Sequence, residues 1–305
     1  MKKRVLVLHY SQTGQLTNVL ENMIAPLKSA KNIEVVMTKI ESTENFSFPW
    51  SFFKFFDAFP ETVYLDGPRN KSLDIANIDF DLIIIGYQPW FLSPSMPMSS
   101  FMKSDEAKII LKDKPVITVI GCRNMWIEAQ KTMKELIEKC DSRLIDNVVL
   151  TDQSGPLESF VTTPRWMLTG KKDAFYGLSP AGINAQDIKK SSRFGERILE
   201  KLNANAEKKD EPMLTNLGAV KADDRFVFSE KIAKRSFRIW GKLIRLFGKR
   251  GAIARRPIVV IYVAFLFTLI ITVVPINMMV QTLLRRVFKE KNDKILIEIE
   301  KPSGR

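Results

Sequence analysis

Histidine and cysteine are scarce in this chain, and their scarcity limits the chemistry that it can perform. Its 305 residues include one histidine and two cysteines. A multi-histidine metal site is excluded by count, and the wide spacing of Cys122 and Cys140 matches neither a disulfide framework nor a zinc motif. We therefore expect no metal site, and we interpret His9, which lies inside an apolar run, as a packed strand residue.

Two further signals are missing near the N-terminus. Residues 1–4 lead into only a few apolar residues, which predicts no secretory signal peptide. The turn after this apolar run contains Gly14 but not the full G-x-G-x-x-G pattern, so a dinucleotide fingerprint is absent there. What remains to be interpreted is an uneven charge and a series of apolar runs.

The net charge of +13 is concentrated at one end of the chain. Residues 1–205 carry 26 Lys and Arg against 24 Asp and Glu, whereas residues 206–305 carry 21 against 10. A basic C-terminal third on a nearly neutral remainder favours a surface anchor over a general nucleic-acid-binding domain. We therefore expect a membrane partner and no nucleic acid.

Five short apolar runs alternate with segments of helical periodicity. Continuous hydrophobic runs between helices are typical of parallel strands that are buried on both faces. The sequence therefore predicts an α/β fold, a doubly wound five-stranded parallel sheet. We expect strands at 5–8, 33–40, 82–85, 116–120 and 144–150, and helices at 16–27, 98–111, 126–140 and 185–202.

Polar and aromatic residues follow three of these strands where each one ends. The first loop, Ser11-Gln12-Thr13-Gly14-Gln15, offers hydroxyls, a glycine and a helix N-terminus, as a phosphate-binding loop requires; an ordinary capped turn explains it equally well. Ligands of doubly wound sheets bind beyond the carboxyl ends of the strands. The three loops together indicate a planar phosphorylated ligand, with rim packing as the alternative for Tyr87, Trp90 and Trp126.

These loops resemble those of the flavodoxin-like superfamily, whose members bind flavin mononucleotide (FMN). Ser11-Gln12-Thr13-Gly14 matches the phosphate loop, and Gly86-Tyr87-Gln88-Pro89-Trp90 through Pro97 resembles the isoalloxazine-contacting loop. The usual threonine two places after the glycine is Leu16, which removes or shifts one phosphate hydrogen bond. The resemblance implies FMN as the cofactor, bound by Ser11, Gln12, Thr13, Gly14, Gln15, Leu16, Tyr87, Gln88, Pro89, Trp90, Phe91, Gly121, Cys122, Arg123 and Trp126.

Two insertions enlarge the predicted flavin-binding domain, which we place at residues 1–203. The first, 41–80, is dense in Phe and Trp, too apolar for a solvated loop. We expect it to wall a hydrophobic pocket or enter a membrane interface, with a helix packed on the sheet edge as the alternative. The second, 151–184, mixes Gly, Pro and aromatic residues at the ligand edge, which predicts a lid over the flavin.

The tail divides into a linker and two membrane-directed segments. Residues 204–227 are polar and read as a linker, and residues 228–256 predict a basic amphipathic helix of the kind that lies in a membrane interface. A nucleic-acid-binding helix has similar charge but does not need the uncharged segment that follows. One stripe of the helix is basic (Arg235, Arg238, Lys242, Arg245 and Lys249) and the other is apolar (Phe237, Trp240, Ile244 and Phe247).

Residues 257–280 are long and apolar enough to span a bilayer. Basic residues lie on both sides of this segment, including the tail at 281–305, so its orientation is less clear than its attachment. Pro275 leaves a re-entrant hairpin open. We expect a domain anchored at the cytoplasmic face of the inner membrane.

A flavin-like edge, enclosing insertions and a membrane tail predict an FMN-dependent oxidoreductase that acts on a hydrophobic substrate. The pattern HYSQTGQL, the aromatic insertion and the length are similar to the aromatases of dialkylresorcinol biosynthesis, also labelled condensing enzymes. That resemblance implies oxidation of a dialkyl-cyclohexanedione to a dialkylresorcinol on the route to aryl-polyene pigment lipids, with a ketosynthase or acyl carrier protein as partner. Arg123 or Tyr87 is the candidate for holding a dione oxygen.

Three alternatives stay open at this stage. One is a membrane-tethered NAD(P)H- or quinone-linked flavin reductase. Another is a tethered electron carrier with no substrate of its own. A third is a flavodoxin-shaped protein that binds no flavin and recruits partners to the membrane. Homo-oligomerisation is also left open.

Overall fold

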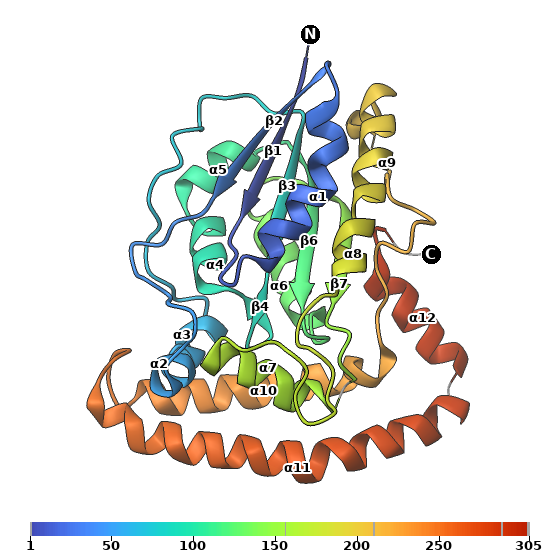
Figure 1. Ribbon diagram of the computed structural model, residues 1–305. Coiled ribbons are helices and arrows are strands. Elements are labelled where there is room, and N and C mark those ends of the chain that lie inside the picture. Colours follow the sequence, from blue (N-terminus) through green and yellow to red (C-terminus); the bar gives the residue numbers. More distant parts are fainter. Residues whose placement is uncertain (1, 156, 210, 288, 304–305) are drawn as a thin grey trace.

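A five-stranded parallel sheet forms the centre of the computed structural model (Figure 1). The structure describes residues 2–155, 157–209, 211–287 and 289–303, without the side chains of 273–275, 277–279, 281–287, 289 and 291–292. The strand order is β2-β1-β3-β6-β7, which is the order of flavodoxin-like sheets. The strands are β1 (Lys3–His9), β2 (Ile33–Lys39), β3 (Leu82–Tyr87), β6 (Pro115–Cys122) and β7 (Arg143–Thr151).

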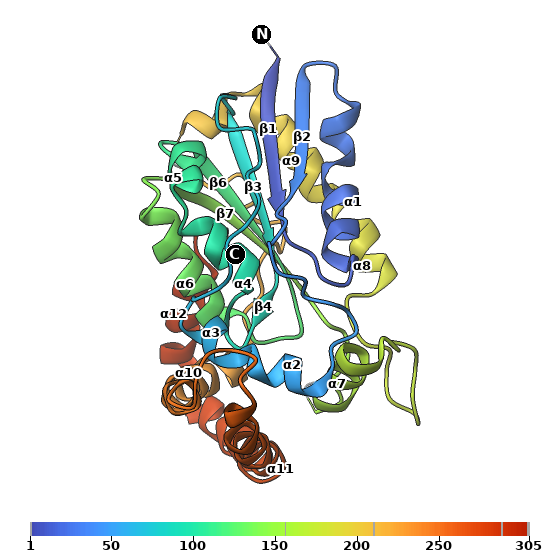
Figure 2. The ribbon, with the colours of Figure 1, turned by 90° about the vertical axis from the view of Figure 1, so that its left-hand side faces the viewer.

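This order confirms the predicted fold class, and each predicted apolar run falls in one strand. Helices cover both faces of the sheet, as Figure 2 shows. One face carries α1 (Gln15–Ser29), α8 (Ala185–Lys190) and α9 (Ser192–Asn203); the other carries α4 (Met96–Met102), α5 (Asp105–Leu111) and α6 (Ile127–Glu138).

Two of the predicted helices are each divided in two. The segment 98–111 is interrupted at Ser104, whose hydroxyl accepts a hydrogen bond from the Ala107 amide at 3.1 Å and caps α5. The segment 185–202 is interrupted at Ser191, whose hydroxyl donates to Val19 and Ile188 carbonyls. Serine competes with the helical backbone for hydrogen bonds, which favours such breaks.

The two insertions contribute short elements at the carboxyl edge of the sheet. The first contains α2 (Phe52–Asp57) and α3 (Phe59–Val63), and the second contains α7 (Ser159–Thr169). A small hairpin of β4 (Pro89–Trp90) and β5 (Ser93–Pro94) lies after β3.

The segment predicted as a polar linker packs on the sheet domain. Met213 and Leu214 are buried, and their backbone amides donate to the carboxylate of Asp146 in β7 at 2.6 and 3.3 Å. The Val149 amide of the same strand donates to the Ala219 carbonyl at 2.8 Å. The polar composition of 204–227 hid the few apolar residues that cover this strand, so the interpretation of this segment as a linker is corrected around 213–219, which packs on the sheet.

Among the described residues after the short 3-10 helix η1 (Ala206–Lys208), three α-helices follow. They are α10 (Asp224–Arg245), α11 (Arg256–Val287), preceded by η2 (Ile253–Arg255), and α12 (Lys289–Glu300). Figures 1 and 2 show α10 and α11 side by side beneath the carboxyl ends of the strands, and α12 returning beside β7. We call α10, α11 and the segment that joins them, residues 246–255, the base.

Among the described residues, one stretch of the base is long and apolar enough to cross a membrane. It is Ile253–Thr272, of which only 22% is buried. The helix continues through Pro275, so the hairpin left open there does not form. The basic helix predicted at 228–256 instead begins at Asp224 and ends at Arg245. Of the predicted tail, the basic side chains Arg285 and Arg286 lie outside the described residues.

Three of the four residues of the predicted apolar stripe, Phe237, Trp240 and Ile244, pack against protein, whereas Phe247 lies beyond the end of α10 and is 45% exposed. Phe59 of α3 contacts the Phe237 ring at 5.2 Å, and Tyr262 of α11 contacts the Trp240 ring at 5.5 Å. Ile244 is fully buried in the same cluster. Because α11 lies alongside, this stripe is covered by two helices of the chain itself, which corrects the expectation that it meets a membrane interface.

Candidate functional site

The candidate site is a pocket at the carboxyl edge of the sheet, where the chain turns in opposite directions from β1 and β3. Such a switch point is where doubly wound sheets bind ligands. Three strand-end loops and both insertions meet there. The lining residues are Gln12, Thr13, Gln15, Leu16, Phe55, Gln88, Pro89, Trp90, Phe91, Gly121, Cys122, Arg123, Asp152, Thr163, Trp166, Met167, Gly182 and Ile183.

The first loop presents backbone N–H groups to the pocket, just before the start of α1. Gly14 is the N-cap residue, with φ of 79°, a conformation that glycine adopts without strain. A Cβ placed there meets no atom within 4 Å, so the loop is open on that side. Within the described residues, no hydrogen bond engages the backbone amides of Gln12, Thr13 or Gly14. Free amides at a helix N-terminus are what an anionic phosphate requires.

Gln15 ties this loop to the second insertion. Its Nε2 donates to the Ile183 carbonyl and its Oε1 accepts from the Ile183 amide, both at 3.1 Å. Leu16 is buried, and a Cβ on Gly121 would lie 3.4 Å from its Cδ1. Thr17 is hydrogen-bonded to His9 Nε2 at 3.2 Å. The departure from the family pattern at Leu16 is therefore a packing contact, and its neighbour's hydroxyl is already engaged.

Several buried polar atoms around the pocket have no partner among the described residues. They are Ser11 Oγ, Gln12 Oε1 and Thr163 Oγ1. A buried polar atom without a hydrogen bond costs free energy, so such atoms cluster where a ligand supplies the missing partner. Together with the free amides of the first loop, they fit a phosphorylated, hydrogen-bonding cofactor such as FMN.

The second loop supplies an aromatic wall through the β4–β5 hairpin. Phe91 and Leu92 have φ of 47° and 59°, both in the left-handed region. This tight turn places Trp90 against Phe46 and Trp50, each with ring centroids 5.4 Å away. Aromatic pairs at such separations hold one another in fixed orientations. The wall is therefore held by residues of the first insertion.

The third loop, residues 121–126 at the end of β6, places a cation in the pocket. The guanidinium of Arg123 lies 4.0 Å from the centroid of the Phe160 ring, on α7. Burial lowers the pKa of Arg123 to about 10, and the nearby Asp152 partly offsets this. The Asp152 carboxylate accepts the amides of Ser154 and Gly182 at 2.8 and 2.7 Å. Because no ion pair within the described chain includes Arg123, its charge is available to an anionic or carbonyl ligand.

Burial determines the protonation state of two side chains, Cys122 and Tyr87, that the sequence analysis placed near the ligand. The pKa of the Cys122 thiol is raised by burial, so the side chain is neutral and not a thiolate nucleophile. The pKa of Tyr87 is also raised by burial. Its hydroxyl donates to Gln130 Oε1 at 2.7 Å, and Gln130 in turn donates to Thr118 Oγ1 at 3.0 Å.

Tyr87 and Trp126 are corrections to the predicted site. Both side chains are buried in the core, at 0% and 1% exposure, and neither lines the pocket. The strand β3 runs on through Tyr87 and turns its ring between the sheet and α6, so it cannot hold a substrate oxygen. Ser11 and Gly14 belong to the first loop but do not line this cavity. The remaining eleven predicted contact residues do line it.

Sequence reasoning assigned no pocket role to individual residues of the two insertions. The structure adds Phe55 from the first insertion and a larger group from the second. The aromatic and Gly-Pro composition of 151–184 was the available signal for a lid. The two insertions also contact each other, since the Trp50 amide donates to the Met167 carbonyl at 2.8 Å. No sequence pattern indicated that contact. The added residues are Phe55, Asp152, Thr163, Trp166, Met167, Gly182 and Ile183.

The aromatic wall extends from the pocket to the base. Phe91 contacts Phe55 at 5.1 Å and Phe59 at 5.2 Å between ring centroids. Phe59 in turn stacks on Tyr262 of α11 at 4.4 Å, with the two planes 11° apart. The pocket wall and the apolar helix therefore belong to one continuous aromatic cluster.

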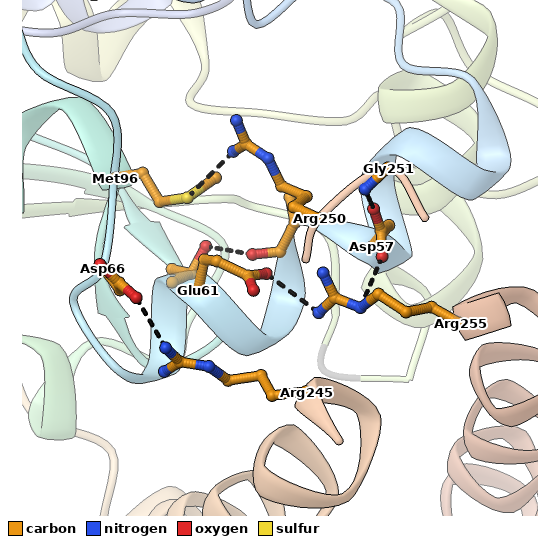
Figure 3. Close-up of polar contacts among 10 residues, drawn as sticks. Asp57, Glu61, Asp66, Met96, Arg245, Arg250, Gly251 and Arg255 are labelled. Atoms are coloured by element: carbon orange, nitrogen blue, oxygen red, sulfur yellow. Dashed lines mark hydrogen bonds and ion pairs between the residues drawn. The ribbon is translucent and has the colours of Figure 1, made fainter. Parts of the chain in front are cut away.

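Buried charge fixes the base to the first insertion (Figure 3). Arg255, 1% exposed, pairs with Asp57 and Glu61, each at 3.1 Å. Burial raises the pKa of Glu61, an effect that Arg255 opposes. Arg245 pairs with Asp66 at 2.7 Å on the same surface.

A buried carboxylate of α10 joins the base to the N-terminus of α6, where the third loop ends. Glu230 of α10 is fully buried and accepts the Glu128 amide at 2.9 Å, at the N-terminus of α6. Burial raises its pKa to about 8, with the backbone amides of α6 opposing the shift. Nearby, Lys234 donates to the Leu92 carbonyl at 2.6 Å and to Ser93 Oγ at 2.7 Å. The base thus contacts two of the three ligand loops.

No protein-family model matches the chain, and neither does any curated protein. Among solved structures, a flavodoxin from the domain Archaea is similar at 14% identity over 66% of this chain and 99% of that one, with a TM-score of 0.39. A flavoprotein in complex with FMN from Lactobacillus acidophilus NCFM is similar at 19% identity over 48% of this chain and 93% of that one, with a TM-score of 0.37. Flavodoxin 1 from Bacillus cereus is similar at 11% identity over 65% of this chain and 98% of that one, with a TM-score of 0.38. These likenesses concern the fold, and the chemistry of the site is argued from this chain's own residues.

Proposed function

We propose that this protein is a membrane-associated, FMN-dependent oxidoreductase that acts on a hydrophobic small molecule. The observation that carries the proposal is the joint architecture of the pocket. One end offers free amides and unpartnered polar atoms to a phosphate, and the other is an aromatic wall continuous with an apolar helix. A soluble electron carrier needs neither the wall nor the helix.

Different residues would bind the different chemical parts of the cofactor. The amides of residues 12–14 would bind the phosphate, and Trp90, Phe91 and Trp166 would border the flavin ring. Bound FMN would supply a hydride acceptor. The protein's part is to orient the substrate, to exclude water with the second insertion, and to hold an oxygen with Arg123.

The specific substrate that we propose is a dialkyl-cyclohexanedione, which the enzyme would aromatise to a dialkylresorcinol. This reaction removes two electrons and two protons from the ring; bound FMN would accept the electrons and one proton as a hydride, and the second proton would leave to solvent. The choice of substrate is supported by the resemblance at HYSQTGQL and by the apolar wall, which suits alkyl chains. Arg123 would bind a ring oxygen and stabilise the negative charge that grows there. Supply of the dione by a ketosynthase or acyl carrier protein, and location at the cytoplasmic face of the inner membrane, belong to the same proposal.

Cofactor binding is tested by purifying the protein in detergent, recording its visible spectrum and titrating the apoprotein with FMN. We expect a flavin spectrum, and about tenfold weaker FMN binding for Gly14→Ala, because a left-handed backbone conformation costs other residues about 1–2 kcal/mol. Gly218→Ala is the matched control: it also has positive φ and open space, but lies outside the pocket. Absence of flavin binding would overturn the proposal.

The substrate is tested separately by mixing the FMN-loaded protein with a dialkyl-cyclohexanedione without oxygen. We expect bleaching of the flavin and a product lighter by two hydrogen atoms. Arg123→Met should slow this single turnover about 10- to 100-fold without reducing flavin content, since it removes a charge-assisted hydrogen bond. Quinone reduction by NADPH without conversion of the dione would identify the flavin reductase alternative, and neither activity would indicate a tethered carrier.

A further inference from the structure

We infer that α10 and α11 lie flat on an anionic lipid surface, with the chain after α11 on the same side of the membrane as the sheet domain. The inference rests on the proposed membrane association and replaces a transmembrane span with an in-plane attachment. Three observations carry it: where the two ends of α11 are held, which side chains of the base are exposed, and where its charges lie.

The two ends of α11 are both held by the sheet domain. Near its start, Val259 and Tyr262 are buried against α2, α3 and α10. After its end, Leu296 of α12 is buried in the core cluster, and Glu300 accepts the Ala222 amide at 3.0 Å. Ser303 is also buried, with its hydroxyl accepting the amide of Asn147 in β7.

These contacts exclude a span. The helix has 32 residues and is therefore about 48 Å long, enough to cross the roughly 30 Å core of a bilayer. Crossing would place α12 on the far side, away from β7. The α11 of this structure instead runs across the underside of the domain (Figure 1).

The exposed side of the base is apolar. On α10, four side chains spaced by four and seven residues form one row, each more than half exposed: Phe228, Ile232, Ile239 and Leu246. Residues 257–284 of α11 contain no charged side chain. The exposed large side chains of this stretch are Val260, Ile261, Phe265, Phe267, Ile271, Ile276 and Val280.

Basic residues border the α10 row. Arg235, Arg238 and Lys242 are exposed along one side of it, Lys231 continues that line, and Lys249 is exposed after the end of the helix. An apolar row flanked by cations is the form of a helix that lies at the boundary of headgroups and acyl chains, where anionic lipids add to binding. A transmembrane α11 would give the exposed row of α10 no partner.

Topology is tested by placing single cysteines at Glu34, Lys249 and Glu298 and labelling them with a membrane-impermeant maleimide. Glu34 is exposed in the sheet domain, Lys249 precedes α11, and Glu298 is exposed on α12. The unsubstituted protein, with Cys122 and Cys140 only, gives the background. In spheroplasts and in inverted vesicles we expect all three sites to label from one and the same side. Labelling of Glu298→Cys from the opposite side would overturn the inference while leaving membrane association intact.

The lipid surface is tested by flotation of the full chain with vesicles that contain phosphatidylglycerol. Ile239→Glu in α10 should weaken binding at least tenfold, since it removes an exposed apolar side chain that the lipid would bury and adds a negative charge, which anionic lipid repels. The control is Ile109→Glu, which is 62% exposed on α5, away from the base. Equal binding of both variants and wild type would contradict an in-plane base, as a span through α11 alone predicts that result.

Two further outcomes are also informative. Failure of the wild type to bind any vesicle would overturn both this inference and the membrane part of the proposed function, whatever its flavin content. A detergent-free dimer that loses its association in Ile239→Glu would assign the row to a second copy of the chain, which also overturns the inference.

Discussion

The two ends of the pocket are built in opposite ways. The polar end comes from one continuous loop, residues 11–16, joined by a single side chain to Ile183. The aromatic end comes from three segments far apart in the sequence: Phe55 in α2, the hairpin at Trp90 and Phe91, and Trp166 in α7. The first is a local motif, whereas the second exists only after the chain has folded.

The difference separates the residues that a phosphorylated cofactor needs from those that shape the rest of the pocket. The polar end resembles what any phosphorylated ligand needs, and it depends on few distant contacts. The aromatic end is held by Tyr262 and by buried charges of the base, so its shape is coupled to α10 and α11. Changes in the base are therefore expected to alter stability and the wall, and changes in the loop to alter cofactor affinity.

The largest expected effect comes from Arg255→Met. Removing one partner of a buried ion pair costs about 3–5 kcal/mol, because Asp57 and Glu61 are left without their counter-charge. We expect this loss in thermal or denaturant unfolding in detergent. Arg256→Met is the control, because Arg256 is exposed, with its guanidinium 5.3 Å from the centroid of the Phe53 ring.

The same experiment has an internal rescue. Adding Asp57→Asn and Glu61→Gln to Arg255→Met removes the uncompensated carboxylates, so part of the lost stability should return. If the single variant is no less stable than Arg256→Met, the base is not anchored by charge.

The next effect concerns pH and Glu230. The pKa of this buried carboxyl is about 8 in the folded protein against an ordinary 4.5. The folded state therefore keeps a proton that the unfolded chain releases between these values, and the stability from this site is full below 4.5 and lost as the pH rises through 8. Glu230→Gln should flatten the decline in stability over that range.

Glu135→Gln, on the exposed side of α6, is the control for this pH effect, because it changes the same charge at a solvated position. Unfolding curves of both variants and wild type between pH 5 and pH 9 are the measurement. A decline that persists unchanged in Glu230→Gln would assign it to another group.

At the polar end, Gln15→Leu should weaken cofactor binding and leave the membrane binding of the base unchanged. It leaves the amide and carbonyl of Ile183 without partners, at a cost of about 1–3 kcal/mol. We expect roughly tenfold weaker FMN binding in a titration, with membrane binding unchanged. Asn18→Ala, on the exposed side of the same helix, should leave both unchanged. Loss of vesicle binding in Gln15→Leu would contradict the separation of the two ends.

The extent of correct sequence prediction follows the same division. The strands and the first loop are local patterns, so they could be identified from apolar runs and from glycine. Tyr87 was misplaced because β3 is buried on both faces, and a continuous apolar strand gives no alternation that shows where a side chain points. The covered stripe of α10 was misread because an amphipathic helix has the same pattern whether its partner is lipid or a neighbouring helix.

The smallest expected effect tests the departure from the family pattern at Leu16. Restoring a threonine adds a hydroxyl to the first turn of α1, but Leu16 is buried beside Gly121, and threonine cannot fill that space. We therefore expect Leu16→Thr to lower stability by about 1–2 kcal/mol without tightening FMN binding. Leu16→Val, which shortens the side chain without a hydroxyl, separates packing from polarity. If Leu16→Thr binds FMN several-fold more tightly than Leu16→Val, the hydroxyl reaches the phosphate, and the polar end can be improved independently of the packing around it.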